Sequence, residues 1–474
     1  MEEDLLKAQQ TQGVAPDSEN EGMMVKYQGI SPNLPKGAKV NPEEKLEAGI
    51  LVTDTGVHTE CLEAFKDKDS FTPEEIDEIY EATIRAGVID HHVIDSFFSA
   101  KGVDSKKCAT QMVFDYKEAV LAMVKEKGIT NVETHFDSDM DAIGSSYMVR
   151  SLIDNGELPS IAEDLAAVTN LEDYGENKLD PEPYVNSLAG TVGSIKDMLG
   201  NQARASLGKD VFGNPDMKDE NGRLTAEGVQ KMNLIKSKFE NMRNEYVFAV
   251  FNALEKAKTA DPDFDIKGDI SGLELPEEIA KVVSDGREAM RASMEEFLVE
   301  FEAAEKAKMT VKDREGNDID VNVVIGSSKK PLIFTNMAYL RTNPDTIVAC
   351  YAGEDRAFGD NYDIGITPDM ANSIDMSALC LALNKAEKEK RDALRSKEDP
   401  TDDEKAMIEG WDGQADREAF SGLNDKIASG EVPAEDVITK DPTVLVAGGS
   451  LIAASRTSLL GEEDFKKVFD TFKK

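Results

Sequence analysis

The chain has 474 residues, enough for two or three domains with sizeable hydrophobic cores. Its 54 Lys and Arg against 93 Asp and Glu leave a net charge of −39, which argues against binding of long nucleic acid or of an anionic membrane surface. A small phosphorylated substrate held by local cations is compatible with this charge. No stretch reaches the roughly 18 apolar residues of a membrane span, and the acidic start MEEDLLKAQQTQ is unlike a signal peptide.

The cysteines indicate a reducing compartment. The chain has four of them, Cys61, Cys108, Cys350 and Cys380, widely spaced and without a CxxC pair. Such spacing is typical of buried thiols rather than of a disulfide framework or a zinc site. We therefore expect a cytoplasmic protein.

The first part of the chain has the pattern of an α/β domain. Residues 1–46 are polar and lack sustained periodicity, and we expect an N-terminal arm there. Over 47–185, short apolar strands alternate with amphipathic helices, which predicts a doubly wound parallel sheet. Strands are expected at 47–56, before Asp90, and from 132. Helices are expected at 70–87, behind a Ser/Thr-Pro-Glu-Glu cap, and at 108–128, each ending at a glycine.

The remainder divides into two segments. Residues 186–308 are mainly helical, and we expect an insertion or connector that packs on itself or on the second subunit of a homodimer. Residues 309–474 predict a smaller second α/β domain. Its strand candidates are MTVKD, IDVNVVIG, PLIFTNMAYL, TIVACYAG and NYDIGIT, followed by a helix at about 376–396. The end reads as the strand TVLVA, a glycine turn, small residues around Arg456 and a final amphipathic helix.

The stretch VETHFDSDMDAIGSSYMVRSLI, residues 132–153, begins as a strand and ends as a helix. Between them, His135, Asp137, Asp139 and Asp141 fall on alternate residues. Alternation would place these side chains on one side of an extended segment, where three carboxylates repel one another unless a cation lies among them. The stretch therefore predicts a metal site at the C-terminal end of a strand, where open α/β sheets bind ligands.

Two other interpretations of these aspartates are weaker. One carboxylate could cap the following helix, but capping does not need three with a histidine. A calcium loop fits the first three acidic positions, but it has Ala142 where glycine is needed and Met148 where a bidentate glutamate is needed. Two further residues stay open. Asp137 is either a ligand or a supporting group, and His58 lies either in the site or outside it.

Histidines gather at the same predicted edge. Three of the four, His91, His92 and His135, lie in aspartate-containing segments at strand ends, where they would meet Asp54 and Asp90. Mixed carboxylate and imidazole ligands suit Mn²⁺, with Mg²⁺ or Co²⁺ as alternatives, and the set is large enough for two ions. Two ions about 3.5–4 Å apart can activate a water for attack on phosphorus.

These motifs resemble those of the DHH phosphoesterase superfamily. The name-giving triplet and its following helix resemble VIDHH at 88–92 and the CATQMVFDY that comes after it. The first motif of the superfamily resembles HFDSDMDAIGS at 135–145. The strand that ends in the metal-bridging aspartate resembles GILVTDTG at 49–56. The superfamily includes manganese-dependent pyrophosphatases, exopolyphosphatases, short-oligonucleotide nucleases and cyclic-dinucleotide phosphodiesterases. There the acidic motif comes first, whereas here it follows the triplet; a circular permutation would restore the same edge.

The resemblance implies a metal-binding role for five motif residues. His135 and Asp139 would bind one ion, and Asp141 and His91 would bind the other. Asp54 would bridge both ions.

The resemblance also implies supporting and catalytic roles. Asp90 would support His91, and His92 would contact the phosphate. A fourth motif usually supplies another metal-binding aspartate, and here Asp173 in NLEDYG is preferred over Asp164 in IAEDLA.

The last segment resembles the superfamily's accessory substrate-binding domain, of the DHHA1 type. Residues suited to binding a phosphate follow its last predicted strand. Glycines let the backbone approach a phosphate, and hydroxyls and an arginine can donate hydrogen bonds to it. These are Gly448, Gly449, Ser450, Ser455, Arg456 and Thr457. The turn lacks the Gly-Gly-Gly-His form of many members, so the resemblance assigns no substrate class. An ordinary turn with a surface arginine is the other interpretation, and GWDGQAD (410–416) is a rival segment for the same role.

The leading hypothesis is a metal-dependent phosphoesterase that hydrolyses phosphodiester or phosphoanhydride bonds through a water activated by two metal ions. The expected substrate is small or short: pyrophosphate, polyphosphate, a short oligonucleotide or a nucleotide. His92, Asp90 and Arg456 would act on it. One alternative is an aspartyl-phosphate phosphatase with Asp139 as nucleophile and Asp141 as acid and base. The other is a non-catalytic protein that binds metal or nucleotide.

Overall fold

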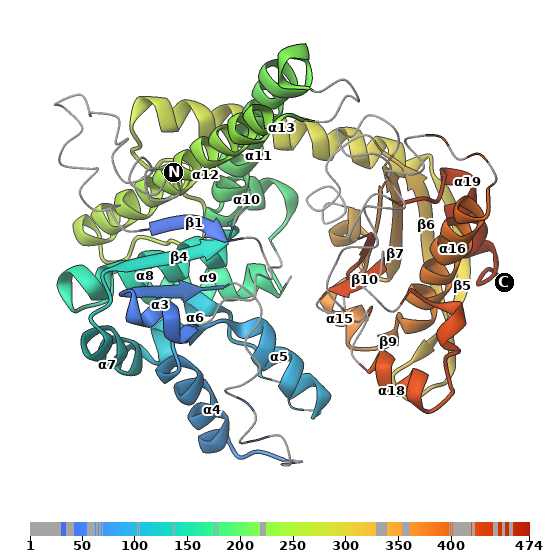
Figure 1. The fold of residues 1–474 in the computed structure, drawn as a ribbon, viewed down its shortest axis with the longest axis horizontal. Helices are drawn as coiled ribbons and strands as arrows, with labels where there is room; N and C mark the ends of the chain where they lie inside the picture. The colour runs from blue at the N-terminus through green and yellow to red at the C-terminus, as the bar shows by residue number, and fades with distance from the viewer. Residues whose placement is uncertain are drawn as a thin grey trace.

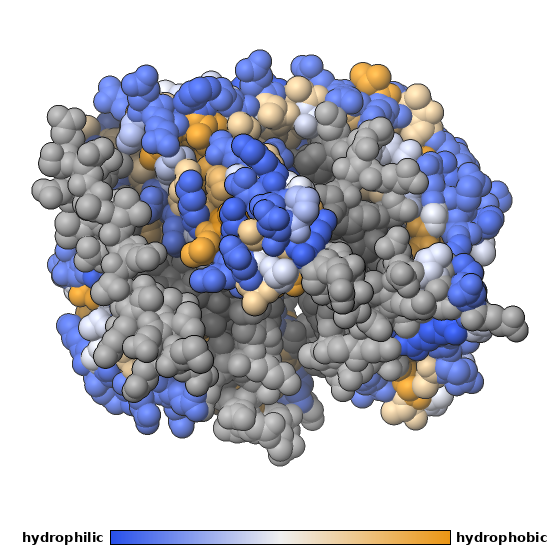
Figure 2. Space-filling view, turned by 45° about the horizontal axis from the view of Figure 1, so that its top comes forward, coloured by the Kyte–Doolittle hydropathy of each residue, from blue (hydrophilic) through white to orange (hydrophobic). Residues whose placement is uncertain are grey.

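Two parts of the chain, each built around its own sheet, are joined by the long helix α13 (Glu277–Glu302), as Figure 1 shows. The computed structural model describes residues 30–34, 42–54, 62, 65, 68, 70–101, 103, 105–135, 138–174, 176–177, 179–218, 224–328, 339–352, 361–397, 399, 401, 419, 422–438, 444–447, 451–454 and 458–474. Within these ranges, every helix is too short or too polar to cross a bilayer. On the face in Figure 2, hydrophilic residues predominate and hydrophobic residues form small separate patches.

Four parallel strands form the first sheet. Their order is β1 (Ile30–Leu34), β4 (Asn131–His135), β2 (Ile50–Thr53) and β3 (Val88–Ile89). Because all pairs are parallel, the chain leaves β4, β2 and β3 at the same edge of the sheet. The expected α/β class is confirmed.

Strand β1 lies where the sequence predicts an N-terminal arm. Its backbone pairs with β4, from Ile30 beside Val132 to Leu34 beside His135, so residues 30–34 form a strand that the sequence did not predict. The segment ISPNL lacks the apolar alternation that would predict a strand. Its proline is compatible with a strand because β1 lies at the end of the sheet, where one set of backbone groups has no neighbour to pair with.

Local signals place the helices of this part correctly. Helix α4 (Pro73–Arg85) begins with a capping box formed by Thr72 and Glu75, and the chain turns at Gly87 with φ of 82°. The helix expected at 108–128 is two helices, α6 (Ala109–Asp115) and α7 (Lys117–Lys127), and the second ends at Gly128 with φ of 63°.

The helices of the predicted connector belong to the core of the first part. Val247 and Phe251 of α12 are buried in one hydrophobic cluster with Leu51 of β2 and Val132 of β4. The segment is helical as expected, but it packs on the first sheet and its helices and not only on itself. The other helices of this part are α3 (Pro42–Glu47), α5 (His91–Ala100), α8 (Met140–Asn155), α9 (Ala162–Asp173), α10 (Pro181–Asn186), α11 (Leu188–Leu207) and α12 (Ala226–Ala260). Shorter helical turns follow at Gly208–Phe212 and Pro215–Met217.

The second part is a seven-stranded mixed sheet covered by helices. Its strand order is β10 (Val444–Ala447), β11 (Leu451–Ala454), β8 (Asn361–Gly365), β7 (Thr346–Ala352), β6 (Asp318–Ser327), β5 (Glu305–Asp313) and β9 (Ile374–Asp375). Its helices are α15 (Pro368–Ala371), α16 (Ser377–Arg395), α18 (Leu423–Ala428) and α19 (Glu462–Asp470), with a 3-10 turn at Ala434–Asp436.

Most predicted elements of the second part are confirmed. The strands expected within 309–365 are β5 to β8, and the helices expected at about 376–396 and at the end are α16 and α19. The residues after the glycine turn differ, because Leu451–Ala454 forms a strand antiparallel to β10. The strand expected at 331–340 lies outside the described residues except for Tyr339 and Leu340, which are helical.

Contacts among the described residues link the parts. Phe297 and Phe301 of α13 stack with ring centroids 4.1 Å apart and are buried against the second sheet. Arg341 donates from Nη2 to the backbone oxygen of Asn177 at 2.6 Å, and its guanidinium lies 5.6 Å from the centre of the Tyr184 ring. The second contact places a residue of the second part close to the end of α9.

Candidate metal centre

Asp54 follows β2 at the sheet edge in an unusual backbone conformation. Its φ of 49° is the one positive value among the described non-glycine residues. Its backbone amide donates to the oxygen of Ile89 at 2.8 Å, which fixes the turn against the end of β3. The side chain is 1% exposed, and its Oδ1 has no hydrogen-bond partner among the described residues. A strained and buried carboxylate with one oxygen that lacks a hydrogen bond is typical of a functional position.

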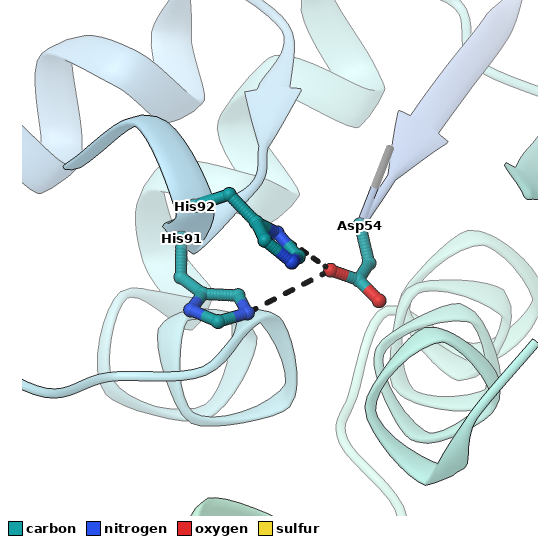
Figure 3. Close-up of side chains that lie close together, drawn as sticks. All are labelled: Asp54, His91 and His92. Atoms are coloured by element: carbon teal, nitrogen blue, oxygen red, sulfur yellow. Dashed lines mark ion pairs between the residues drawn. The ribbon is translucent and has the colours of Figure 1, made fainter. Parts of the chain in front are cut away.

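His91 and His92 begin α5, directly after β3. Both rings point toward Asp54, as Figure 3 shows: Nε2 of His91 lies 3.8 Å and Nδ1 of His92 lies 3.3 Å from Oδ1 of Asp54. Asp90 was expected to support His91, and its Oδ1 contacts the neighbouring His92. Oδ1 of Asp90 accepts from the backbone amide of His92 at 3.0 Å and lies 3.1 Å from its Nδ1, whereas Nδ1 of His91 lies 2.7 Å from Asp95.

The third strand end supplies His135 and Asp139. His135 is fully buried, and its Nε2 lies 3.3 Å from Oδ2 of Asp54 and 4.0 Å from Oδ2 of Asp139. Oδ1 of Asp139 accepts from the backbone amide of Ala142 at 3.0 Å and thereby caps α8. Capping and a metal site are therefore compatible here, because the cap uses one oxygen and the other faces His135.

Asp141 lies in the first turn of α8, so the expected alternation on an extended segment is wrong. β4 ends at His135 and the helix begins at Met140, so Asp141 is part of the helix and not of the strand. Its two oxygens accept from the backbone amides of Ala109 and Thr110, both at 2.7 Å. A helix places residues two apart on different sides, and the hydrogen bonds to α6 fix the direction.

Asp173 is the fourth-motif candidate that lies in this region. It ends α9, and its Oδ2 lies 3.3 Å from Nε2 of His91. Asp164, near the start of the same helix, instead pairs with Lys258 at 3.2 Å and Lys267 at 3.4 Å. The geometry favours Asp173.

These side chains form three overlapping groups in which the ligand atoms lie within 4.8 Å of one another. The groups are Asp54 with His91 and His92, Asp54 with His135 and Asp139, and His91 with Asp141 and Asp173. Asp54 belongs to two groups and His91 belongs to two. The residues that the resemblance implies as metal ligands all belong to these groups: Asp54, His91, His135, Asp139, Asp141 and Asp173.

The electrostatics of the groups call for added positive charge. Burial raises the pKa of Asp141 to about 6, and the charge of Asp54 adds to the rise. Burial also raises the pKa of Asp173 to about 7, although His91 opposes it. Burial lowers the pKa of His91, but the hydrogen bond with Asp95 and the charges of Asp173, Asp141 and Asp54 outweigh it and leave the pKa well above 6.5. Without a metal, the groups therefore tend to hold protons that a divalent cation would replace.

The residues fit a divalent cation by a second measure. Oδ1 of Asp54 and Nε2 of His91 are both buried and both lack a hydrogen-bond partner among the described residues. Each is a good metal ligand, one an oxygen and one an imidazole nitrogen, and they face each other across 3.8 Å. Two buried polar atoms without hydrogen bonds destabilise a fold, whereas a cation between them would satisfy both.

Several expected residues lie outside the described part of the chain. These are His58, Asp137 and the whole predicted substrate-binding set, Gly448, Gly449, Ser450, Ser455, Arg456 and Thr457. The described residues beside them are the strands β10 and β11 and Ser458. Ser458 Oγ and the amide of Leu459 both donate to Glu387, a fully buried carboxylate on α16.

Two residues that contact the groups were not expected from the sequence. Asp95 lies one helical turn after His91 on α5, and Tyr174 directly follows Asp173. The spacing of four residues between His91 and Asp95 is a signal that could have identified Asp95, given a helix beginning at His91. The partnership of Tyr174 with His91, 83 residues away, has no such signal.

Comparisons with protein-family models, with curated proteins and with solved structures find no match.

Proposed function

We propose that this protein is a metal-dependent phosphoesterase that hydrolyses phosphodiester or phosphoanhydride bonds of a small phosphorylated substrate. The observation that carries the proposal is the overlap of the ligand groups: the group of Asp54, His91 and His92 shares Asp54 with one of the other two groups and His91 with the other. Shared ligands bring cation positions close together, the arrangement used in two-metal phosphoryl transfer. The resemblance of the motifs to the DHH superfamily supports the same activity, and with it a doubly wound first domain.

The proposed ligand sets follow the groups. One ion would be held by Asp54, His135 and Asp139, which form one group, and the other by His91, Asp141 and Asp173, which form another. Asp54 lies with His91 in the third group and would therefore contact the second ion as well. Mn²⁺ suits this mixture of carboxylates and imidazoles, with Mg²⁺ or Co²⁺ as alternatives. Two bound cations would supply an acidified water and would offset the negative charge that develops on the phosphoryl oxygens.

His92 would hold the phosphate. Its side chain is 38% exposed, whereas that of His91 is 7% exposed, so His92 is the more accessible of the pair. Burial lowers the pKa of His92, but the hydrogen bond with Asp90 and the charge of Asp54 outweigh this effect and raise it. A protonated imidazole oriented by Asp90 can donate a hydrogen bond to a phosphoryl oxygen.

The contacts of Asp139 and Asp141 count against the aspartyl-phosphate alternative. Asp139 would have to be a nucleophile while it caps α8. Asp141 would have to move protons while both of its oxygens accept backbone amides. Both arrangements suit carboxylates that are held still as ligands.

The second part of the chain is proposed as the substrate-binding domain. Arg456 and its neighbours would contact the phosphate, and the net charge of −39 favours a short substrate over long nucleic acid. Pyrophosphate, polyphosphate, short oligonucleotides and nucleotides are the classes to test. A cytoplasmic location is part of the proposal, and the three described cysteines, Cys108, Cys350 and Cys380, are buried and form no disulfide with one another.

The test is phosphate or nucleotide release by metal-stripped protein with and without added Mn²⁺. The panel holds pyrophosphate, short polyphosphate, a dinucleotide, a cyclic dinucleotide and a nucleoside monophosphate. Asp54→Ala with His91→Ala should abolish turnover, and Asp173→Ala should reduce it. Asp164→Ala is the matched control on the same helix and should leave turnover unchanged, because Asp164 pairs with lysines outside the groups.

Two outcomes would contradict the proposal. Metal binding without turnover of any substrate would favour the non-catalytic alternative. Turnover that is independent of divalent metal, or that survives in the double variant, would exclude this centre as the active site.

A further inference from the structure

The ring of His91 is held on its far side by two residues that none of the ligand groups includes. Nδ1 of His91 lies 2.7 Å from Oδ2 of Asp95 and 3.1 Å from the hydroxyl of Tyr174. The Tyr174 hydroxyl donates to the same Asp95 oxygen at 2.6 Å. Nδ1 of His91, the Asp95 carboxylate and the Tyr174 hydroxyl therefore each contact the other two.

These contacts determine which nitrogen of His91 carries hydrogen. An ionised carboxylate only accepts hydrogen bonds, so Nδ1 must donate to Asp95. In a neutral imidazole the other nitrogen then carries the lone pair. That nitrogen, Nε2, is the atom that lies 3.3 Å from Asp173, 3.8 Å from Asp54 and 3.9 Å from Asp141.

Tyr174 is itself fixed by its surroundings. It directly follows Asp173 at the end of α9, and its ring meets that of His91 edge to face, with centroids 5.7 Å apart. The ammonium of Lys106 lies 5.8 Å from the centre of the tyrosine ring and pairs with Glu176 at 2.8 Å. Because Asp173 and Tyr174 are adjacent in the chain, a ligand and the support of a second ligand occupy one rigid segment.

We propose that Asp95 and Tyr174 are positioning residues that orient His91 and its hydrogen so that Nε2 faces the cation shared with Asp141 and Asp173. This inference rests on the proposed metal centre, but it concerns residues that the resemblance does not assign. Carboxylates that accept the second N–H of a ligand histidine fix the ring and increase its basicity, and losing them typically weakens metal binding by about 10–100-fold.

The experiment measures metal binding directly and does not depend on activity. Metal-stripped wild type, Asp95→Asn, Tyr174→Phe and the double variant are titrated with Mn²⁺ by calorimetry and with Co²⁺ by visible absorption. Each single variant should weaken one binding step by about 10-fold or more and alter the Co²⁺ absorption bands. The double variant should lose less than the product of the two single losses, because both residues act on the same nitrogen.

Matched controls exist in the same part of the chain. The hydroxyl of Tyr116 donates to Asp77 in a second tyrosine–aspartate pair that contains no histidine. Tyr116→Phe and Asp77→Asn should leave both titrations unchanged. Tyr174→Phe keeps the aromatic ring, and thermal unfolding of each metal-free variant shows whether its fold is retained.

Two results would overturn the inference, and they are distinguishable. If His91→Ala loses a binding step while Asp95→Asn and Tyr174→Phe bind and absorb like wild type, the positioning role is wrong and the metal centre stands. If His91→Ala and wild type bind Mn²⁺ equally, or neither binds, the metal centre itself is wrong and the positioning role goes with it.

Discussion

Replacing Asp54 by asparagine should affect stability in opposite directions with and without metal. Asparagine has the same shape, and it tolerates the left-handed conformation that Asp54 adopts at φ of 49°. In metal-free protein, ligand oxygens of Asp54 and Asp139 lie within 4.8 Å, where two negative charges repel by about 3 kcal/mol at an effective dielectric constant of about 20. The charge of Asp54 also repels that of Asp141, whose pKa it raises, and protonated His91 and His92 offset part of the combined repulsion. We therefore expect the metal-free variant to be about 1 kcal/mol more stable than wild type.

Added Mn²⁺ should reverse the order. A ligand at 100 times its dissociation constant stabilises the folded protein by about 2.7 kcal/mol. Wild type should gain this amount, and Asp54→Asn should gain much less, because Asp54 belongs to two of the ligand groups. The measurement is denaturant unfolding of both proteins with EDTA and with Mn²⁺.

The control is Asp363→Asn, which changes a buried aspartate of β8 in the other sheet and should leave the Mn²⁺ response intact. The reasoning is refuted if Asp54→Asn destabilises the metal-free protein and Mn²⁺ stabilises variant and wild type equally. Asp54 would then be a structural residue of the turn.

Three further predictions concern residues outside the three ligand groups. Burial raises the pKa of Glu387 to about 7 from 4.5, so its proton binds more tightly in the folded state and its contribution to stability is lost as pH rises from about 4.5 to about 7. Unfolding at pH 5 and pH 8 should show wild type losing about 3 kcal/mol more than Glu387→Gln, and parallel profiles would contradict this. Gly144→Ala should destabilise the protein by about 1–3 kcal/mol, because the added Cβ would lie 2.7 Å from Oγ1 of Thr110. An added Cβ at Gly200, in helix α11, would lie 3.8 Å from Nη1 of Arg204, an ordinary van der Waals distance. Gly200→Ala should therefore be neutral or stabilising when both variants are unfolded by heat, and equal losses would exclude the steric explanation. Arg341→Lys keeps the charge but removes the guanidinium contacts with the first part of the chain, and it should increase the rate of thermolysin cleavage; an unchanged rate would mean that those contacts do not hold the parts together.

The strand ends of the site were predictable because the rule behind them is geometric. Parallel strands deliver the residues that follow them to one edge, so Asp54, His91 and His135 could be expected together from their places after apolar runs. The structure brings these residues together, with Asp139, Asp141 and Asp173 beside them. The prediction needed no knowledge of strand order.

What the sequence could not predict depends on contacts between distant segments. β1 is a strand because it pairs with β4, about a hundred residues later, and not because of its own composition. The alternation of Asp139 and Asp141 suggested an extended segment, but the helix cap begins one residue before Met140. The helical segment at 186–308 was expected to be an insertion or connector, since only the folded chain brings Phe251 and Leu51 into one hydrophobic cluster.

The order of the strands explains why Asp54 belongs to two groups. Along the chain its strand comes before those of His91 and His135, but in the sheet β2 lies between β3 and β4. A residue at the end of the middle strand can reach partners on both sides, and Asp54 lies 3.8 Å from His91 on one side and 3.3 Å from His135 on the other. The order of the motifs in the sequence can therefore change while the bridging position does not. The place of Asp54 between its partners depends on β2 lying between β3 and β4 in the sheet. The loops can connect these strands in a different order along the chain without changing that arrangement.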